Sequence, residues 1–292
     1  MRKHTASIFK NGMILIAESG STKTEWRIID SKQNVFHARS GGINPYYLDA
    51  AGILEVMRMG LIEYIDAPFK EVYFYGAGCS STRNKQTIRD CFMQLFPNAK
   101  IEINHDMLAA ARSLCGIEEG IACILGTGSN SCLYDGIGII ENVRSLGYIL
   151  GDEGSGNYLG KQFLTHYFKK ELPKEISDQF DEEFGLEAPD ILNNIYHHHM
   201  PILYLSSFSK FIHKYLKDPM IYQMVYDAFK KFVELNVLKY TNFKNIPVHF
   251  TGSVAFYYED ILRKVGADLG INIKDIVVGP IDGLTQYHQP KK

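Results

Sequence analysis

The chain contains the same short arrangement twice, and this repetition limits the folds it can adopt. Residues 13–17 and 121–125 are apolar runs of strand length, and each is followed by a turn that contains glycine and then by a second strand-like segment. We therefore expect two lobes of related architecture. A length of 292 residues is enough for two domains of ordinary size.

The order of the predicted elements is similar in the two halves. The first half shows three antiparallel strands and then alternates helix, strand, helix and strand, which favours a mixed sheet with helices on both faces. We place this lobe at 13–115 and expect a C-terminal helix, 282–292, to pack back on it. The second lobe, 116–281, repeats the three strands, carries a helical insert at about 158–240, and closes with a strand, a helix at 255–269 and a last strand.

Composition excludes several classes of protein. Hydrophobic residues make up 46% of the chain and charged residues 22%, as in a folded globular protein. A net charge of −2 without long runs of one sign gives no reason to expect a nucleic-acid partner. No apolar stretch approaches the roughly 18–20 residues of a membrane-spanning helix, and the N-terminal segment has no apolar core of a secretory signal. We therefore expect a cytoplasmic protein without a membrane partner.

The cysteines predict neither a disulfide framework nor a zinc site. Five of them are scattered through the chain, and no CxxC pair occurs among them. Buried, reduced thiols are the expected state.

The two turns are candidates for phosphate binding. Residues 18–24 and 126–130 are small or polar and connect strands, so they can bend tightly and direct backbone N–H groups and hydroxyls at an anion. The first is not a Walker A loop, and the second lacks the last glycine of GxGxxG because Ser131 stands there. An ordinary polar hairpin is the alternative interpretation of each turn.

A single carboxylate stands at the predicted edge of the first sheet. Asp106 follows a short strand and precedes an alanine-rich helix, which places it at the carboxyl end of that strand, where ligands bind in α/β sheets. The alternative role of Asp106 is an N-cap of the helix. Two further segments, 147–156 and 251–255, combine glycine with polar residues at helix starts, which suits close approach of the backbone to a ligand.

Together, these segments carry a family resemblance. Residues 18–24, Asp106, 126–130, 151–155 and 252–255, in this order, resemble the five-motif pattern of the actin-like ATPase superfamily. More narrowly, the chain is similar to N-acetylglucosamine kinase-like members of the BadF/BadG/BcrA/BcrD-type ATPase family. The resemblance implies an α/β fold of two ribonuclease H-like lobes, each a mixed five-stranded sheet with flanking helices, with a cleft between them. Ser19 departs from the family pattern, which usually has a second glycine there, and Glu18 stands where Asp is commoner.

The resemblance also implies roles for particular residues. Asp106 matches the catalytic base, and Glu18 matches a magnesium-binding position that acts through water. The positions that match phosphate-binding residues are Gly20, Ser21, Thr22, Lys23, Thr127 and Gly128. The positions that match adenosine contacts are Gly252 and Ser253, and those that match sugar contacts are Asn44, Asn130, Gly147 and Asp152.

The expected activity is therefore ATP-dependent phosphorylation of an amino sugar, with Mg²⁺, by a cytoplasmic homodimer. N-acetylglucosamine, phosphorylated at its 6-hydroxyl, is the first expectation; N-acetylmuramic acid and glucosamine are alternatives. Two other activities stay open: an ATPase that activates an iron–sulfur dehydratase, which needs clustered cysteines, and a non-catalytic sugar sensor.

Overall fold

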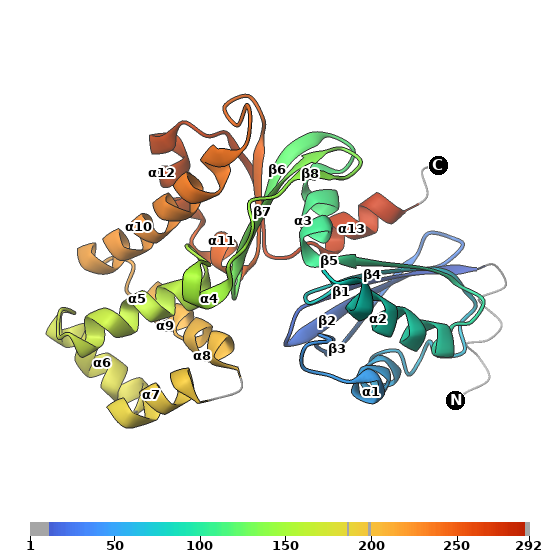
Figure 1. The fold of residues 1–292 in the computed structure, drawn as a ribbon, viewed down its shortest axis with the longest axis horizontal. Coiled ribbons are helices and arrows are strands. Elements are labelled where there is room, and N and C mark those ends of the chain that lie inside the picture. Colours follow the sequence, from blue (N-terminus) through green and yellow to red (C-terminus); the bar gives the residue numbers. More distant parts are fainter. Residues whose placement is uncertain (1–11, 186, 198–199, 290–292) are drawn as a thin grey trace. The chain divides into compact units, whose positions relative to one another are not determined.

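A computed structural model describes residues 12–185, 187–197 and 200–289 of the chain (Figure 1). The N-terminal segment before residue 12 and the last three residues of the expected C-terminal helix lie outside the described residues, so what the sequence predicts for them stays a prediction. The chain divides into two compact units. One runs to Gly116 and takes up the chain again at Pro280, and the other is Ile117–Gly279.

The first unit is built on a mixed five-stranded sheet. Its strands are β1 (Met13–Ser19), β2 (Lys23–Ile29), β3 (Val35–Gly41), β4 (Phe69–Gly76) and β5 (Lys100–His105). Their order is β3-β2-β1-β4-β5, with β1 and β2, and β2 and β3, antiparallel, and with β4 parallel to both β1 and β5. The carboxyl ends of β1, β4 and β5 therefore meet at one edge, where Ser19 is paired with Gly76 and Gly76 with His105.

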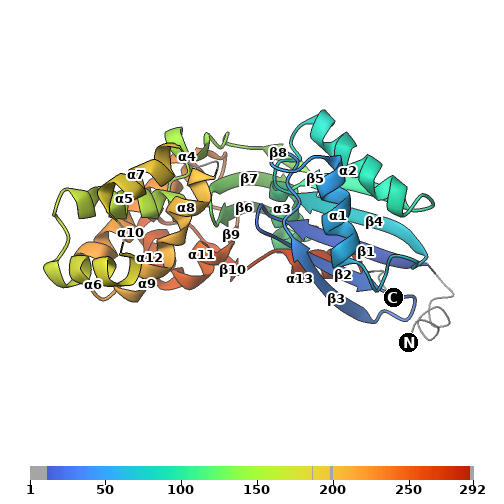
Figure 2. The ribbon, with the colours of Figure 1, turned by 90° about the horizontal axis from the view of Figure 1, so that it is seen from below.

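Helices cover both faces of this sheet (Figure 2). They are α1 (Ala50–Gly60), α2 (Thr82–Leu95), α3 (Asp106–Cys115) and α13 (Ile281–His288). Along β1 the side chains alternate: Leu15 and Ala17 belong to the core under α1 and α2, whereas Ile16 packs with Ala109 of α3 and Leu284 of α13. This alternation places Glu18 on the α3 face and Ser19 on the α1 face.

The second unit is built on a five-stranded sheet of the same topology. Its strands are β6 (Glu119–Leu125), β7 (Ser129–Asp135), β8 (Ile139–Glu141), β9 (Val248–Thr251) and β10 (Ile273–Val277). Read from β8, the order is β8-β7-β6-β9-β10, with the same directions as in the first unit: antiparallel among β6, β7 and β8, and parallel from β6 to β9 to β10. The fold class expected from the repeated strand–turn–strand arrangement is confirmed.

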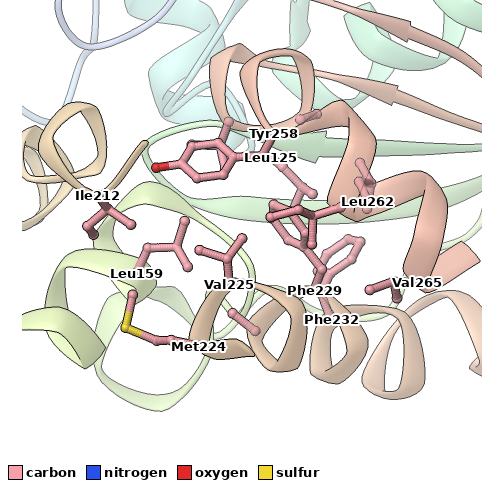
Figure 3. Packing of buried hydrophobic residues seen from close by; sticks show 14 of the residues in the cluster. Leu125, Leu159, Ile212, Met224, Val225, Phe229, Phe232, Tyr258, Leu262 and Val265 are labelled. Atoms are coloured by element: carbon pink, nitrogen blue, oxygen red, sulfur yellow. The ribbon is translucent and has the colours of Figure 1, made fainter. Parts of the chain in front are cut away.

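Helices form most of the rest of the second unit. They are α4 (Gly147–Leu150), α5 (Gly156–Phe168), α6 (Lys174–Phe184), α7 (Ala188–Tyr196), α8 (Pro201–Ser207), α9 (Ser209–Lys214), α10 (Pro219–Leu235), the 3₁₀ turn η1 (Val237–Lys239), α11 (Ser253–Tyr257) and α12 (Glu259–Leu269). Their apolar faces meet in one core with Leu125 of β6, which includes Phe229 and Phe232 of α10 and Leu262 of α12 (Figure 3). Burying such side chains supplies the main favourable free energy of folding.

One predicted helix is divided in two. The sequence predicts a single helix over 255–269, but the chain forms α11 and α12 with a break at Tyr258. The Tyr258 side chain is buried in the core, and its hydroxyl donates to the carbonyl of Ser209. This contact between distant residues occurs at the break between the two helices, and the periodicity of apolar residues in the sequence does not reveal it. Within the described residues, no helix combines the length and the apolar character needed to cross a membrane.

Candidate functional site

The first glycine-containing turn lies at the carboxyl end of β1. The Gly20 N–H donates to the Lys23 carbonyl at 3.0 Å, which closes the turn between β1 and β2. Within the described part of the chain, no hydrogen bond takes up the N–H groups of Ser21 and Thr22. Successive unpaired N–H groups and two hydroxyls can bind an anion.

Ser19 is a structural residue of this turn. Its side chain is fully buried, and its hydroxyl lies 2.7 Å from the Thr24 hydroxyl and accepts the Ile43 N–H at 2.8 Å. The hydroxyl therefore ties the β1–β2 turn to the loop that follows β3. A glycine, which the family pattern has here, would lack these bonds.

Asn44 lies beside the same turn. Its Nδ2 donates to the Ser21 hydroxyl at 2.9 Å, and its Oδ1 accepts the Tyr46 N–H at 3.0 Å. The side chain also touches Gly78 after β4, where an added Cβ would lie 2.4 Å from Oδ1. Asn44 is therefore held at the sheet edge, with part of its hydrogen-bonding capacity used within the lobe.

Asp106 is the first residue of α3 and not its N-cap. His105 occupies the cap position, where its ring accepts the Leu108 N–H, so the N-cap interpretation of Asp106 is wrong. The Asp106 carboxylate instead accepts the adjacent Met107 N–H at 2.8 Å. Burial raises the pKa of Asp106, and no described Lys, Arg or His forms an ion pair with it. A half-buried carboxylate with a raised pKa and no cationic partner among the described residues is a functional-site candidate.

Glu18 is a second carboxylate at this edge. Burial raises the pKa of Glu18 to about 7, against the lowering effect of Lys23, and the charges of Asp106 and Glu25 raise it further. Because the Asp106 charge raises the pKa of Glu18, the two carboxyl groups interact electrostatically. Lys23 itself is well exposed and forms an ion pair with Glu25 at 3.3 Å.

The second glycine-containing turn follows β6. The Gly126 N–H donates to the Gly128 carbonyl at 3.0 Å, and the Gly126 carbonyl accepts the Gly156 N–H of α5 at 2.8 Å. In the described part of the chain, the N–H groups of Thr127 and Gly128 make no hydrogen bond. This turn therefore has the same anion-binding capacity as its counterpart in the first unit.

Asp152 packs directly against this turn. Its backbone is left-handed, with φ of 60°, and its side chain is almost fully buried. Its Oδ1 accepts the Ser129 N–H at 3.3 Å, and an added Cβ at Gly128 would lie 3.1 Å from Oδ2. Burial raises the pKa of Asp152, while hydrogen bonds from Asn157 and Ser129 lower it.

Asn157 is a residue of this site that the sequence did not reveal. Its Nδ2 lies 2.8 Å from Asp152 Oδ2 and 2.6 Å from the Thr127 carbonyl. The only sequence signal is its place in the first turn of a helix after a glycine-rich segment, and that signal does not separate it from its neighbours.

Asn130 and Gly147 lie on the same unit but differ in their surroundings. Asn130 Oδ1 accepts the Ser131 N–H at 2.9 Å and the Asn142 Nδ2 at 3.1 Å. Gly147 has a left-handed φ of 72° and begins α4, with open space where a side chain would stand. Asn130 lies in β7 and Gly147 at the start of α4, and among the described residues neither forms a hydrogen bond with Asp152.

Gly252 joins the predicted adenosine segment to the second turn. Its φ is 118°, and an added Cβ would lie 2.3 Å from the Leu125 carbonyl. Only glycine suits such a conformation and such a close approach. Ser253, the first residue of α11, is exposed. The second unit therefore brings Gly252, the turn at 126–128 and Asp152 together.

The residues of the first unit fit a magnesium ion. Mg²⁺ is usually held by one or two carboxylates together with waters and substrate phosphates, and Glu18 supplies carboxylate oxygens of that kind. No group of three or more His, Cys, Asp or Glu side chains that could hold a metal occurs among the described residues. These residues therefore suit a magnesium ion whose other ligands are nucleotide phosphates and waters. They do not suit a metal bound by protein side chains alone.

Comparisons with known proteins place this geometry in a family. No family model matches the chain, and no curated protein matches it. A solved structure from Porphyromonas gingivalis, described as a "Putative N-acetylglucosamine Kinase", is 40% identical over 94% of this chain and 98% of that one, with a TM-score of 0.90. A second structure with the same description, from Chromobacterium violaceum, is 16% identical over 94% of this chain and 98% of that one, with a TM-score of 0.74.

A third structure, the ethanolamine utilization protein EutJ from Carboxydothermus hydrogenoformans, is 14% identical over 97% of this chain and 92% of that one, with a TM-score of 0.55. At such identities the last two show the fold alone. The repeated sheet and its turns define an actin-like ATPase fold. At 40% identity over nearly its whole length, the chain belongs to the N-acetylglucosamine kinase-like group of the BadF/BadG/BcrA/BcrD-type ATPase family, and the resemblance drawn from the sequence is confirmed.

Proposed function

We propose that this protein is an ATP-dependent sugar kinase that transfers the γ-phosphoryl group of ATP to an amino sugar. The observation that carries the proposal is the half-buried Asp106 carboxylate, whose pKa is raised by burial, which has no cationic partner among the described residues and which stands where parallel strands end. The 40% identical P. gingivalis structure, which is described as a "Putative N-acetylglucosamine Kinase", supports the same class of reaction.

Asp106 is the proposed catalytic base. It accepts the proton of the sugar hydroxyl while the hydroxyl oxygen bonds to the γ-phosphorus and the bond to the leaving ADP oxygen breaks. The raised pKa of Asp106, which burial causes, makes it a better proton acceptor than an exposed aspartate. General-base catalysis of this kind contributes about 10²–10⁴ in rate.

The two turns are the proposed phosphate ligands. In the first unit the N–H groups and hydroxyls of Ser21 and Thr22, with Gly20 and the Lys23 charge, would bind phosphate oxygens; in the second unit Thr127 and Gly128 would do so. Positioning and charge neutralisation carry most of the catalysis in phosphoryl transfer. Glu18 would hold a magnesium ion through water, and the ion would neutralise charge on the phosphates.

Two further groups of residues complete the proposal. Gly252 and Ser253 would border the adenosine, since Gly252 keeps the start of α11 close to the second turn. The proposed sugar contacts are Asn44 in the first unit and Asn130, Gly147 and Asp152 in the second.

The substrate we propose is N-acetylglucosamine, phosphorylated at its 6-hydroxyl. This assignment rests on the similarity to the P. gingivalis protein, which is described as a "Putative N-acetylglucosamine Kinase". N-acetylmuramic acid and glucosamine are the alternatives that a substrate screen must include. A homodimer in the cytoplasm remains part of the proposal on the family resemblance, and light scattering after size-exclusion chromatography tests the dimer.

The structure gives no support to an activator of an iron–sulfur dehydratase. All five cysteines are buried in their own units, whereas a cluster shared between subunits needs cysteines at the protein surface. A non-catalytic sensor would not require a base, and the presence of the half-buried Asp106 carboxylate at the sheet edge favours catalysis.

An assay of ADP release across amino sugars tests the proposal. The wild type should turn over N-acetylglucosamine, and Asp106→Asn, which keeps the shape of the side chain, should lower kcat by about 10²-fold or more. Asp90→Asn, on an exposed position of α2, is the matched control and should behave as wild type. Equal turnover by wild type and Asp106→Asn would refute the assigned base, and no turnover of any sugar by the wild type would refute the kinase.

A further inference from the structure

The first turn of α5 forms backbone hydrogen bonds with the second glycine-containing turn. The Gly126 carbonyl accepts the Gly156 N–H at 2.8 Å, and the Thr127 carbonyl accepts the Asn157 N–H at 3.1 Å. The first N–H groups of a helix have no partner inside the helix, so they are available for such bonds. The start of α5 therefore fixes two consecutive carbonyl groups of the turn.

Fixing these carbonyls also fixes the N–H groups on the other side of each peptide. A trans peptide is planar, so its C=O and N–H point in opposite directions. Because the Gly126 and Thr127 carbonyls point toward α5, the N–H groups of Thr127 and Gly128 point away from it. These are the two N–H groups that no hydrogen bond takes up within the described residues.

The Asn157 side chain adds a second connection. Asn157 is fully buried, and its Nδ2 donates both to the Thr127 carbonyl at 2.6 Å and to Asp152 Oδ2 at 2.8 Å. Both partners are acceptors only, so the amide nitrogen and not the oxygen must face them. One side chain thus joins the turn proposed to bind phosphate to the carboxylate proposed to bind sugar.

We propose that Asn157 is a positioning residue that holds the turn at 126–128 and the Asp152 carboxylate in one geometry, so that nucleotide and sugar binding in this unit depend on the same amide. The inference rests on the proposed function and adds a residue to it. Asn157 contacts neither substrate in this scheme; it acts through Thr127 and Asp152.

Two variants test the proposal. Asn157→Asp keeps the shape of the side chain, removes both donors, and sets a carboxylate beside Asp152 and the Thr127 carbonyl. Asn157→Ala removes the donors without adding charge, and it covers the case in which the aspartate variant fails to fold. Asn193→Asp, an exposed asparagine on α7, is the control for the added charge.

The expected result is a joint loss. Both Asn157 variants should raise the KM for the sugar and the KM for ATP, and lower kcat/KM about 10- to 100-fold, since hydrogen bonds to a charged group are worth about one to two powers of ten. Asp152→Asn should raise the KM for the sugar by a larger factor than it weakens MgATP binding, which calorimetry without sugar measures, because Asp152 also packs against the turn. Asn193→Asp should change neither constant.

The pH profile separates positioning from a loss of folded protein. The Asn157 amide favours the ionised form of Asp152, so Asn157→Ala should move the acid limb of kcat/KM for the sugar to higher pH, whereas a smaller amount of folded protein would lower the whole curve equally. Asn157→Gln, which keeps an amide, should recover part of the lost affinity.

The outcomes for the two proposals can be told apart. If the wild type phosphorylates an amino sugar but both Asn157 variants keep wild-type constants, the positioning role is wrong and the kinase stands. If the wild type binds MgATP without phosphorylating any sugar, weaker MgATP binding by Asn157→Ala still supports the positioning role. A wild type that binds no MgATP overturns both.

Discussion

The hydroxyl of Tyr75 lies 2.7 Å from Nε2 of His288, and this bond joins the C-terminal helix α13 to strand β4 of the first unit. The His288 ring also stacks on Tyr73, with centroids 3.7 Å apart. Arg112 of α3, the helix that begins at Asp106, donates to the same Tyr75 hydroxyl at 2.7 Å and forms an ion pair with Glu102 at 2.8 Å. A polar network therefore fastens α13 and α3, the helix that begins with the proposed base, to the sheet.

This network predicts a pH-dependent stability. Burial, reinforced by the Arg112 charge, lowers the pKa of His288 from 6.5 to about 4. Between these values the unfolded chain binds a proton at His288 that the folded chain does not, so the contribution of His288 to stability is complete above pH 6.5 and is lost as the pH falls toward 4. The slope from this one group is at most about 1.4 kcal/mol per pH unit.

His288→Phe isolates that contribution. Phenylalanine keeps the stacking on Tyr73, and Arg112 still donates to the Tyr75 hydroxyl, so the variant should fold and show a flatter decline of unfolding free energy between pH 6.5 and 4. Urea unfolding at several pH values measures the slope. His37→Phe, at an exposed position of β3, is the control. The same slope in wild type and His288→Phe would contradict the prediction.

Ser19→Ala should destabilise the protein. The change removes a fully buried hydroxyl and leaves the Ile43 N–H and the Thr24 hydroxyl without that partner. Leaving buried polar groups unsatisfied costs about 1–3 kcal/mol. Ser80→Ala, an exposed serine in the same unit, should change stability by less than about 0.5 kcal/mol. Chemical denaturation of both variants compares them, and equal stabilities would show that the Ser19 hydroxyl is dispensable.

The sequence was sufficient to predict the sheets and the turns for physical reasons. Strand periodicity and glycine positions are local signals, and the repeated strand–turn–strand arrangement at 13–17 and 121–125 gave the repeated topology. The position of Asp106 at the sheet edge could be predicted because it follows a strand and begins a helix. What could not be predicted depends on contacts between residues that are distant along the chain, such as the partner of Tyr258 or the bond between Tyr75 and His288.

Asn157 shows why part of the site was missed. Asparagine is one of the residue types favoured at a helix N-cap, but here Ser155 is the cap and the Asn157 side chain donates to Thr127, thirty positions earlier in the chain. The cap at α3 was misjudged for a similar reason, because His105 takes the position that an aspartate usually holds. Propensities rank residue types and do not decide between neighbouring residues.

Trp26 reports on the first unit alone. It is the only tryptophan in the sequence, it is fully buried, and its Nε1 donates to the Ser40 hydroxyl at 2.9 Å. Each unit has its own hydrophobic core, so tryptophan fluorescence should follow unfolding of the first unit, whereas far-UV circular dichroism should be dominated by the helices of the second. We expect the two urea transitions not to coincide.

A second reporter checks this interpretation. In the Trp26→Phe background, Phe256→Trp places the only tryptophan at a partly exposed position of α11 in the second unit. Its fluorescence transition should then match the circular dichroism curve. Coincident transitions for both reporters would mean that the chain unfolds as one cooperative unit.

Gly252→Ala should weaken MgATP binding by distorting the second unit and not by blocking the nucleotide. An alanine at a φ of 118° is strained, and its Cβ would lie 2.3 Å from the Leu125 carbonyl. Backbone strain of this kind costs about 1–3 kcal/mol, and relieving the contact must move either α11 or the strand that ends at the turn 126–128. Gly138→Ala, where an added Cβ meets nothing within 4 Å and φ is not positive, is the matched control.

The measurement must separate distortion from simple blocking. Unfolding free energy and MgATP affinity are therefore determined for both variants without sugar present. Distortion predicts that Gly252→Ala loses stability and affinity together, because the Leu125 carbonyl precedes Gly126 in the same turn, while Gly138→Ala keeps both. A Gly252→Ala protein of wild-type stability with weakened MgATP binding would instead assign Gly252 to direct contact with the nucleotide.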